Sequence, residues 1–385
     1  MSEEWNVRRL EDLVLIKGGK RLPRGELLTN SRNSHPYVRV TDMNGRHISK
    51  ENLQYVPEDI FPLIKRYIVN KGEVILSIVG TIGLVSIIQK ELDNASLTEN
   101  CVKLRPLDSN LSGRFLYYFL ISQKGQAEIK KGTVGSTQPK LPLYNIQKIQ
   151  IPLPPLNIQS RVANILSSLD DKIELNLQMN KTLAAMAQTI FREWFIDFRF
   201  PGFDGKLIDG LPPEWRNGYL IDIMDLLYGK ALKSDERKRG NYPVVGSGGI
   251  VGTHGSFFVS GPGIVIGRKG TIGNVYWIER NFYPIDTTFF IKDLLGASSL
   301  YYHYFILRNQ FFRRISSDSA VPGLNRNEAL RNKVVVPTVQ IVNLFNETIK
   351  PVFDKIRVNS DNITTLTILR DSLLPKLMAG KISLL

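Results

Sequence analysis

The most regular feature of the sequence is a seven-residue hydrophobic repeat between Ile158 and Phe198. Apolar side chains recur in two interleaved series, and spacings of three and four residues place both series on one face of a helix. The members are Val162, Leu169, Asn176, Leu183 and Ile190, with Leu166, Ile173, Asn180, Ala187 and Trp194. This pattern predicts one long amphipathic helix with a coiled-coil seam.

The same pattern returns at the C-terminus, where Phe345 takes the place of Val162. Its members are Phe345, Val352, Asn359, Leu366 and Leu373, with Ile349, Ile356, Ile363, Arg370 and Leu377. We expect the two helices to pair antiparallel, with the amides of Asn176, Asn180 and Asn359 within one helical turn of each other. The expected pairing residues are Leu169, Ile173, Asn176, Asn180, Leu183, Val352, Ile356, Asn359, Ile363 and Leu366.

A proline interrupts the second of these repeats. Pro351 cannot donate a backbone hydrogen bond, so it predicts a break or kink in the C-terminal helix. The repeat places the matching bend near Ser167 and Ser168. A short helix before each bend and a long helix after it would then be separate rods.

The segments before the two helices are also repeated. The pattern W-x-x-x-x-L-x-D begins at Trp5 and again at Trp215, and a Gly-Lys pair at 19–20 returns at 229–230. Both features return at the same offset along the chain. The chain therefore contains two copies of a domain, each followed by a long helix.

Each copy also contains short strand-type runs and an aromatic helix. A Gly-Thr-Ile-Gly turn follows the strands at a smaller offset than the Gly-Lys pair, so the second copy is shorter before this turn. We expect the aromatic side chains to form core and inter-domain packing, with base stacking as the alternative. The strands are expected at 37–40, 74–79, 242–245 and 264–267, the turns at 80–83 and 270–273, and the aromatic helices at 115–120 and 301–306.

Length and composition limit what these repeats can build. A chain of 385 residues with 43% hydrophobic content can form two or three domains with real cores. It has one cysteine, no signal-peptide pattern and no apolar run longer than 74–88, so we expect a cytoplasmic protein without a membrane segment. The expected boundaries are 1–150 and 215–336 for the domains, 151–200 and 337–385 for the helical spacers, and 201–214 for a linker.

The net charge of +14 is concentrated outside the helices. Basic residues outnumber acidic ones by 22 to 15 in residues 1–150 and by 17 to 12 in residues 201–336, but they balance at 5 each in residues 151–200. This distribution suggests that the domains bind a polyanion while the helices bind each other or another protein. A basic surface that serves only solubility is the alternative.

Motifs for catalysis are missing from the sequence. It contains no phosphate-binding loop, no G-x-G-x-x-G nucleotide turn and no H-E-x-x-H zinc helix, and its four histidines are scattered. Asp108, Glu128 and Lys130 loosely imitate a metal-dependent nuclease, but the last two fall on a predicted helix. We therefore expect no catalytic residue, no metal site and no cofactor in this chain.

These features together resemble the specificity subunit of type I restriction-modification systems. Both W-x-x-x-x-L-x-D patterns and the stretch with Met186-Ala187-Gln188 and Trp194-Phe195 carry the resemblance, which covers about Trp5 to Gly380. It implies an α+β fold with an internal pseudo-twofold repeat, in which two α/β target-recognition domains alternate with two helical spacers paired as an antiparallel coiled coil. It also implies a non-catalytic reader of double-stranded DNA. Two modification (methyltransferase) subunits and, in the full complex, two restriction subunits would be its partners, and they would carry S-adenosylmethionine, ATP and Mg.

Such a protein would read two halves of a bipartite DNA site, with the helices setting the distance between them. The expected phosphate contacts are Lys17, Lys20, Arg21 and Arg24 in the first copy and Lys233, Arg237, Lys238 and Arg239 in the second. The expected base contacts are Arg39, Arg46, Thr137, Gln138 and Lys140, with Ser247, His254, Arg268, Lys269 and Arg326. Two alternatives remain open: an autonomous DNA methyltransferase or nuclease, and a protein-only scaffold.

Overall fold

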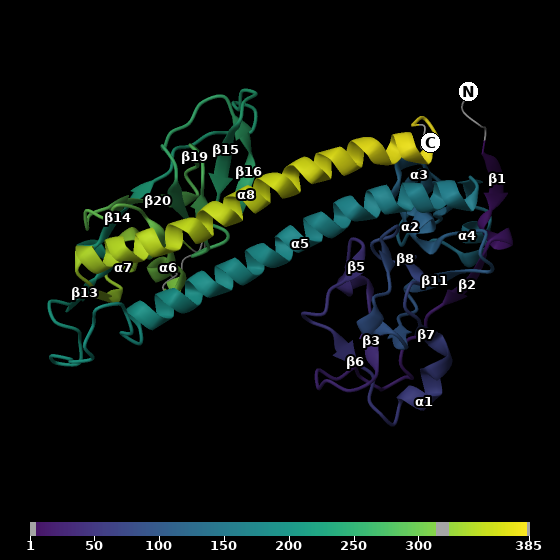
Figure 1. The fold of residues 1–385 in the computed structure, drawn as a ribbon, viewed down its shortest axis with the longest axis horizontal. Helices are drawn as coiled ribbons and strands as arrows, with labels where there is room; N and C mark the ends of the chain where they lie inside the picture. The colour runs from purple at the N-terminus through teal and green to yellow at the C-terminus, as the bar shows by residue number, and fades with distance from the viewer. Residues whose placement is uncertain (1–4, 313–322, 383–385) are drawn as a thin grey trace. The chain divides into compact units, whose positions relative to one another are not determined.

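The computed structural model describes residues 5–312 and 323–382 (Figure 1). It contains two compact units, Met1–Glu174 with Ile363–Leu385 and Leu175–Asn362. Each unit combines one copy of the repeated domain with parts of both long helices.

The first unit is built on two four-stranded sheets. One has the order β2-β11-β8-β9 and is antiparallel, and the other has the order β6-β3-β10-β7 with β3 and β10 parallel. Their strands are β2 (Val14–Gly18), β3 (Pro36–Val38), β6 (Gln54–Tyr55), β7 (Ile68–Val69), β8 (Val74–Ser77), β9 (Val85–Ile87), β10 (Ala95–Leu97) and β11 (Cys101–Pro106). Two further pairs are β1 (Asn6–Arg9) with β12 (Gln150–Leu153) and β4 (Met43–Asn44) with β5 (His47–Ile48). The short helices are α1 (Phe61–Ile64), α2 (Gly113–Ile121), α3 (Gln123–Gly132) and α4 (Leu143–Gln147).

The aromatic helix α2 lies in the core of this unit. Phe115, Tyr118 and Phe119 are among the largest fully buried side chains of the protein. They belong to one hydrophobic cluster with Val162 and Leu377 from the two long helices. The prediction that these aromatic residues form core packing is confirmed.

The second unit repeats the same topology. Its main sheet has the order β14-β20-β17-β18, which matches β2-β11-β8-β9 strand for strand, and β15 pairs in parallel with β19 as β3 does with β10. The strands are β13 (Arg216–Tyr219), β14 (Met224–Tyr228), β15 (Tyr242–Gly246), β16 (Gly249–His254), β17 (Gly263–Gly267), β18 (Val275–Ile278), β19 (Tyr283–Pro284), β20 (Thr288–Asp293) and β21 (Lys333–Val336). The helices are α6 (Tyr301–Arg308) and α7 (Arg326–Leu330). The predicted internal repeat is therefore confirmed.

The repeated W-x-x-x-x-L-x-D pattern has the same structural role in both units. Leu10 and Leu220 each begin a short 3-10 helix and have no exposed surface. The aspartate that follows forms an ion pair with an arginine at the start of the copy, at 3.6 Å for Arg8 and Asp12 and 3.2 Å for Arg216 and Asp222. The pattern thus marks the same first turn in both domains.

The two long helices are continuous, α5 from Leu156 to Phe195 and α8 from Val339 to Met378. The predicted break at Pro351 and the matching bend near Ser167 and Ser168 are wrong. Pro351 and Glu347, whose carbonyl loses its helical partner, are both exposed, so water can satisfy that carbonyl. At the other position, the Ser168 hydroxyl donates to the Ile165 carbonyl at 2.8 Å within an uninterrupted helix.

The helices run antiparallel wherever they meet within a unit. In the first unit Arg370 Nη1 donates to Asp170 Oδ1 at 2.9 Å. In the second unit Asn359 Nδ2 donates to Asn180 Oδ1 at 2.9 Å, and the rings of Phe191 and Phe345 lie 6.0 Å apart. Later residues of α5 face earlier residues of α8. The predicted meeting of Asn180 and Asn359 is confirmed, whereas the buried Asn176 Nδ2 has no hydrogen-bond partner among the described residues.

Candidate nucleic-acid interface

The repeated Gly-Lys pair anchors a basic loop to the sheets of each unit. Gly19 N donates to Cys101 O at 3.0 Å, and Gly229 N donates to Thr288 O at 3.1 Å. A Cβ atom on either glycine would lie 2.1 Å from a backbone oxygen, so only glycine fits at this point. The basic residues that follow are therefore held next to the sheet by backbone hydrogen bonds.

The first basic loop, residues 17–24, presents its charges to solvent. Lys17, Lys20, Arg21 and Arg24 are all exposed, and Arg21 Nε lies 3.1 Å from Glu99 Oε1. Arg21 and Arg24 border a depression of about 770 Å³. Sequence reasoning missed several polar residues that line it, among them Tyr37, Thr41, Gln54 and Asn100, because they come from separate strands and turns.

Arg39 lies in the wall of this depression and is held by several partners. Its guanidinium forms an ion pair with the buried Asp42 at 2.9 Å and donates to Gln54 Oε1 at 2.5 Å and to the Asn52 carbonyl at 2.8 Å. These partners fix the side chain as part of the wall. The base contact expected of Arg39 remains a prediction.

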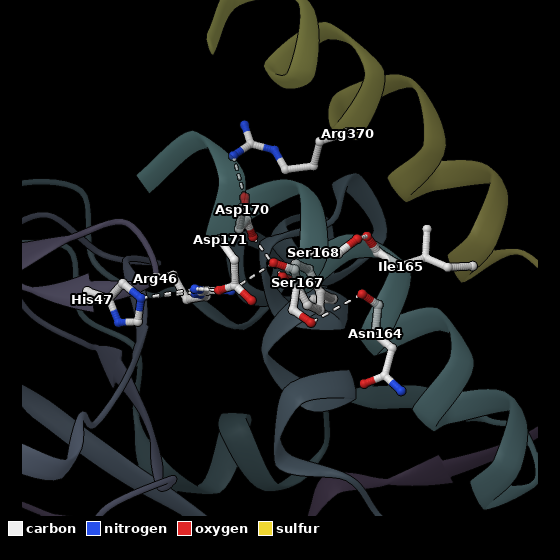
Figure 2. Close-up of polar contacts among 10 residues, drawn as sticks. Arg46, His47, Asn164, Ile165, Ser167, Ser168, Asp170, Asp171 and Arg370 are labelled. Atoms are coloured by element: carbon white, nitrogen blue, oxygen red, sulfur yellow. Dashed lines mark hydrogen bonds and ion pairs between the residues drawn. The ribbon is translucent and has the colours of Figure 1, made fainter. Parts of the chain in front are cut away.

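Arg46 lies at the tip of the β4–β5 hairpin and points to helix α5 (Figure 2). It forms an ion pair with Asp171, and its Nε donates to His47 Nε2 at 3.2 Å. Burial lowers the pKa of the Arg46 guanidinium, but the contact with Asp171 outweighs this effect and leaves the pKa raised. Base reading by Arg46 stays a prediction, and it would require this ion pair to break.

A second ion pair lies on the other side of the same turn of α5 (Figure 2). Asp170 is buried, binds Arg370 of α8 and accepts a hydrogen bond from the Tyr118 hydroxyl at 2.7 Å. Burial, followed by the nearby Asp170 carboxylate, raises the pKa of Tyr118, so the hydroxyl stays protonated and donates. Adjacent aspartates thus connect α5 to the hairpin, to α2 and to α8. Sequence reasoning missed Asp170 because the heptad series passes through its neighbour Leu169.

The loop at 133–140 holds three of the expected base contacts in exposed positions. Thr137, Gln138 and Lys140 are exposed, while backbone bridges join Lys140 to Val134 and to Val79. These bridges place the loop beside the Gly-Thr-Ile-Gly turn that follows β8. The three side chains are therefore accessible to a DNA groove, as base contacts require.

The basic loop of the second unit, residues 233–239, is more tightly held. Lys233, Lys238 and Arg239 are exposed, whereas Arg237 is half-buried and donates to the Val251 carbonyl at 2.8 Å. His254 is buried, and its Nδ1 accepts from Lys238 N at 3.0 Å. The histidine fixes the loop backbone here, and the base contact expected of it is untested.

The remaining expected contacts of the second unit differ in whether neighbouring residues hold their side chains. Lys269 is exposed and Ser247 is half-buried. Arg268 packs over the Tyr228 ring at 5.0 Å and donates to the Asp286 carbonyl at 3.2 Å. Arg326 binds Asp225 and donates to the Leu226 carbonyl at 2.7 Å, which attaches α7 to β14.

Within the described ranges, no three His, Cys, Asp or Glu side chains lie close enough together to hold a metal ion. Glu128 and Lys130 lie on helix α3, as the sequence predicted. None of the helices in those ranges has the length and hydropathy of a membrane span.

Comparison with known families gives the deciding observation. The sequence matches the type I restriction modification DNA specificity domain over residues 2–185 and a second time over residues 212–365. The chain belongs to this family. The specificity domain therefore occurs twice, once for each copy of the repeat, and each match extends into the long helix that follows.

Named relatives of this specificity-domain protein agree with the assignment. It is 23% identical to the type I restriction enzyme MjaIX specificity subunit of Methanocaldococcus jannaschii, with 99% of this chain and 94% of the relative covered. It is also 23% identical to the HindI specificity subunit of Haemophilus influenzae, with 87% and 91% covered. The solved S subunit of M. genitalium has the same fold, with a TM-score of 0.67, 20% identity, and coverage of 97% and 96%.

Proposed function

We propose that this chain is the DNA sequence-recognition subunit of a type I restriction-modification complex. The observation that carries the proposal is the double occurrence of a DNA specificity domain on two units of equal strand order. Each domain would read one half of a bipartite duplex site. The exposed cations of the two basic loops would hold the phosphate backbone, and side chains such as Gln138 and Lys269 would read base edges.

Catalysis and cofactors belong to other subunits in this proposal. The chain would be non-catalytic, and two modification subunits would bring S-adenosylmethionine for adenine methylation. Two restriction subunits would bring ATP and Mg in the full complex. The long helices would dock the modification subunits and set the unread spacer between the two half-sites.

The first basic loop offers a direct test of DNA binding. Replacing Lys20, Arg21 and Arg24 with alanine should weaken binding to all duplexes and reduce the slope of log K against log salt by about 0.9 for each phosphate that the loop no longer neutralises. The matched control removes three exposed cations from helix α3 of the same unit, Lys124, Lys130 and Lys131. In a fluorescence-anisotropy titration, a loop variant with the same slope as the wild type would show that the loop does not touch DNA.

Two other functions would give different results with the purified chain. An autonomous DNA methyltransferase or nuclease would bind S-adenosylmethionine or modify DNA without a second polypeptide. A protein-only scaffold would bind modification subunits but give no gel shift with duplex DNA. The proposed function predicts DNA binding without methylation, and methylation once a modification subunit is added.

The helices can be tested as a ruler by lengthening both of them. One heptad inserted after Asn180 and one after Ile363 would preserve the seam and add about 10 Å, or ~3 base pairs. The second half-site would also rotate by about 100° around the duplex, so affinity should fall. Methylation mapping should show both half-sequences unchanged with a longer spacer, and an unchanged spacer would refute the ruler.

A further inference from the structure

The two copies of the domain differ at the free edge of one strand. Strands β9 and β18 both follow the Gly-Thr-Ile-Gly turn and both lie at the end of their sheet. In the first unit the β4–β5 hairpin covers this edge: Ile87 N donates to Arg46 O at 2.8 Å, and Ser86 Oγ donates to Gly45 O at 2.7 Å. The ion pair between Arg46 and Asp171 then closes the hairpin onto α5 (Figure 2).

The corresponding edge is open in the second unit. Gly267 N donates to Asn274 O at 2.9 Å. Because hydrogen-bonded pairs alternate along an antiparallel ladder, the backbone N–H and C=O groups of Tyr276 and Ile278 point toward β17. Val275 and Trp277 consequently point their backbone groups away from the sheet. In the part of the chain that the structure describes, the N–H groups of these two residues have no hydrogen-bond partner.

A pocket of about 810 Å³ runs along this open edge. Consecutive residues 275–280 form one side of it, as expected when a strand presents its edge and not a face. Ile250 of β16, Ala184 of α5 and Phe353 of α8 complete the walls. The volume lies in the range of ~300–1,000 Å³ that is typical of binding pockets.

The side chains around the pocket differ from those that hold Arg46 in the first unit. Asp354 of α8 takes the place that Asp171 has in α5, but Lys350 already binds it at 2.5 Å and Arg357 lies 3.8 Å from it. Of the three arginines that line the pocket, Arg280 binds Asp361 at 2.9 Å and Arg357 lies near Asp354. Arg308 among them is exposed and packs over the Tyr304 ring at 5.5 Å. An acidic side chain would therefore suit this pocket better than a basic one.

We propose that the edge of β18 binds an extended segment of a partner protein, which adds a strand to the sheet and fills the place that the β4–β5 hairpin fills in the first unit. The segment would place an apolar side chain between Ile250 and Phe353 and a carboxylate near Arg308. This inference rests on the proposed function, which makes the partner a modification subunit. DNA is a poorer occupant because the lining is largely apolar and includes Glu279 and Asp361. A second molecule of this protein is also a poorer occupant, because its own β4–β5 hairpin is already bound to Asp171.

The test uses the full chain and a purified modification subunit of the same system. Ile250→Arg places a charge in the pocket, and the matched control Val251→Arg places the same charge on the next residue, which is exposed and lies outside the lining. Isothermal titration calorimetry should show about a tenfold weaker Kd for Ile250→Arg and less than about a twofold change for Val251→Arg. Hydrogen exchange at residues 275–278 should slow when the modification subunit binds the wild-type chain.

Other outcomes would overturn the inference in different ways. If both variants bind the modification subunit like the wild type, the docking site is wrong while the proposed function stands. If the wild type does not bind the modification subunit, the proposed function fails as well. A loss of duplex binding confined to Ile250→Arg, or a chain dimer that only this variant dissociates, would assign the pocket to DNA or to a second copy. The pair Ala184→Arg and Ala185→Arg on α5 repeats the comparison if Ile250→Arg does not fold.

Discussion

The ion pair between Asp170 and Arg370 gives a quantitative prediction about the first unit. Its atoms lie 2.9 Å apart, and the exposed fractions are 10% for the Asp170 side chain and 26% for Arg370. Arg370→Leu removes the cation and leaves the carboxylate buried with the Tyr118 hydroxyl. The repeat itself suggests that an apolar pair can replace the ion pair, because Phe353 and Ala187 stand at the positions that correspond to Asp170 and Arg370.

The magnitude follows from the burial of the two groups. Removing one partner of a buried pair costs about 3–5 kcal/mol, and the partial exposure of Arg370 favours the lower end, about 3 kcal/mol. Replacing both residues with leucine removes the stranded charge, so the double variant should lose less than about half of that amount. Arg370 also contacts Asp371 at 2.8 Å, but that carboxylate is 59% exposed. Asp371→Asn is therefore the matched control and should cost less than about 1 kcal/mol.

Local stability can be measured by hydrogen exchange with mass spectrometry on peptides that cover residues 163–174 and 366–378. This assay reports on the first unit without assuming that the whole chain unfolds in one step. The reasoning would be refuted if Arg370→Leu and Asp371→Asn lowered protection equally, or if the double leucine variant were less stable than Arg370→Leu.

Three further predictions concern single positions. Gly19→Ala should cost the first unit about 2 kcal/mol in urea unfolding, because its Cβ would meet a backbone oxygen, whereas Gly18→Ala meets nothing within 4 Å and should cost nothing. Burial lowers the pKa of His47 in the folded chain. Between that pKa and ~6.5, the unfolded chain binds a proton at His47 that the folded chain does not bind. The free energy of unfolding should therefore fall as the pH drops through this range. His47→Gln should reduce the difference in unfolding midpoint between pH 5.5 and 7.5. If the variant and the wild type show the same difference, His47 is not the source of this pH dependence. Asn359→Leu should cost about 1–2 kcal/mol because Asn180 Oδ1 loses its donor, and Asn180→Leu in the same chain should recover most of it; no recovery would contradict the pairing.

Patterns that depend on near neighbours could be predicted from the sequence. The heptad series located both long helices to within a few residues, since a helical face is defined by spacings of three and four. The same series placed Asn176, Asn180 and Asn359 together, and two of them, Asn180 and Asn359, form a hydrogen bond. The repeated Gly-Lys pair identified a shared loop, although the reason for glycine there became visible only in the contact with a neighbouring strand.

The sequence by itself determined that the chain is a duplicated α+β protein with two paired helices and basic domains, because periodicity and repeats are local properties. Only the tertiary structure decided which charged side chains are free. Arg39, Arg46 and Arg326 look like groove readers in the sequence, but each finds a carboxylate: Asp42 three residues away, Asp171 on α5 and Asp225 on β14. The effect of Pro351 was also a tertiary matter, since it depends on whether water reaches the carbonyl that the proline leaves unpaired. The partners of Arg46 and Arg326, and the exposure of a backbone group, are set by segments far apart in the chain.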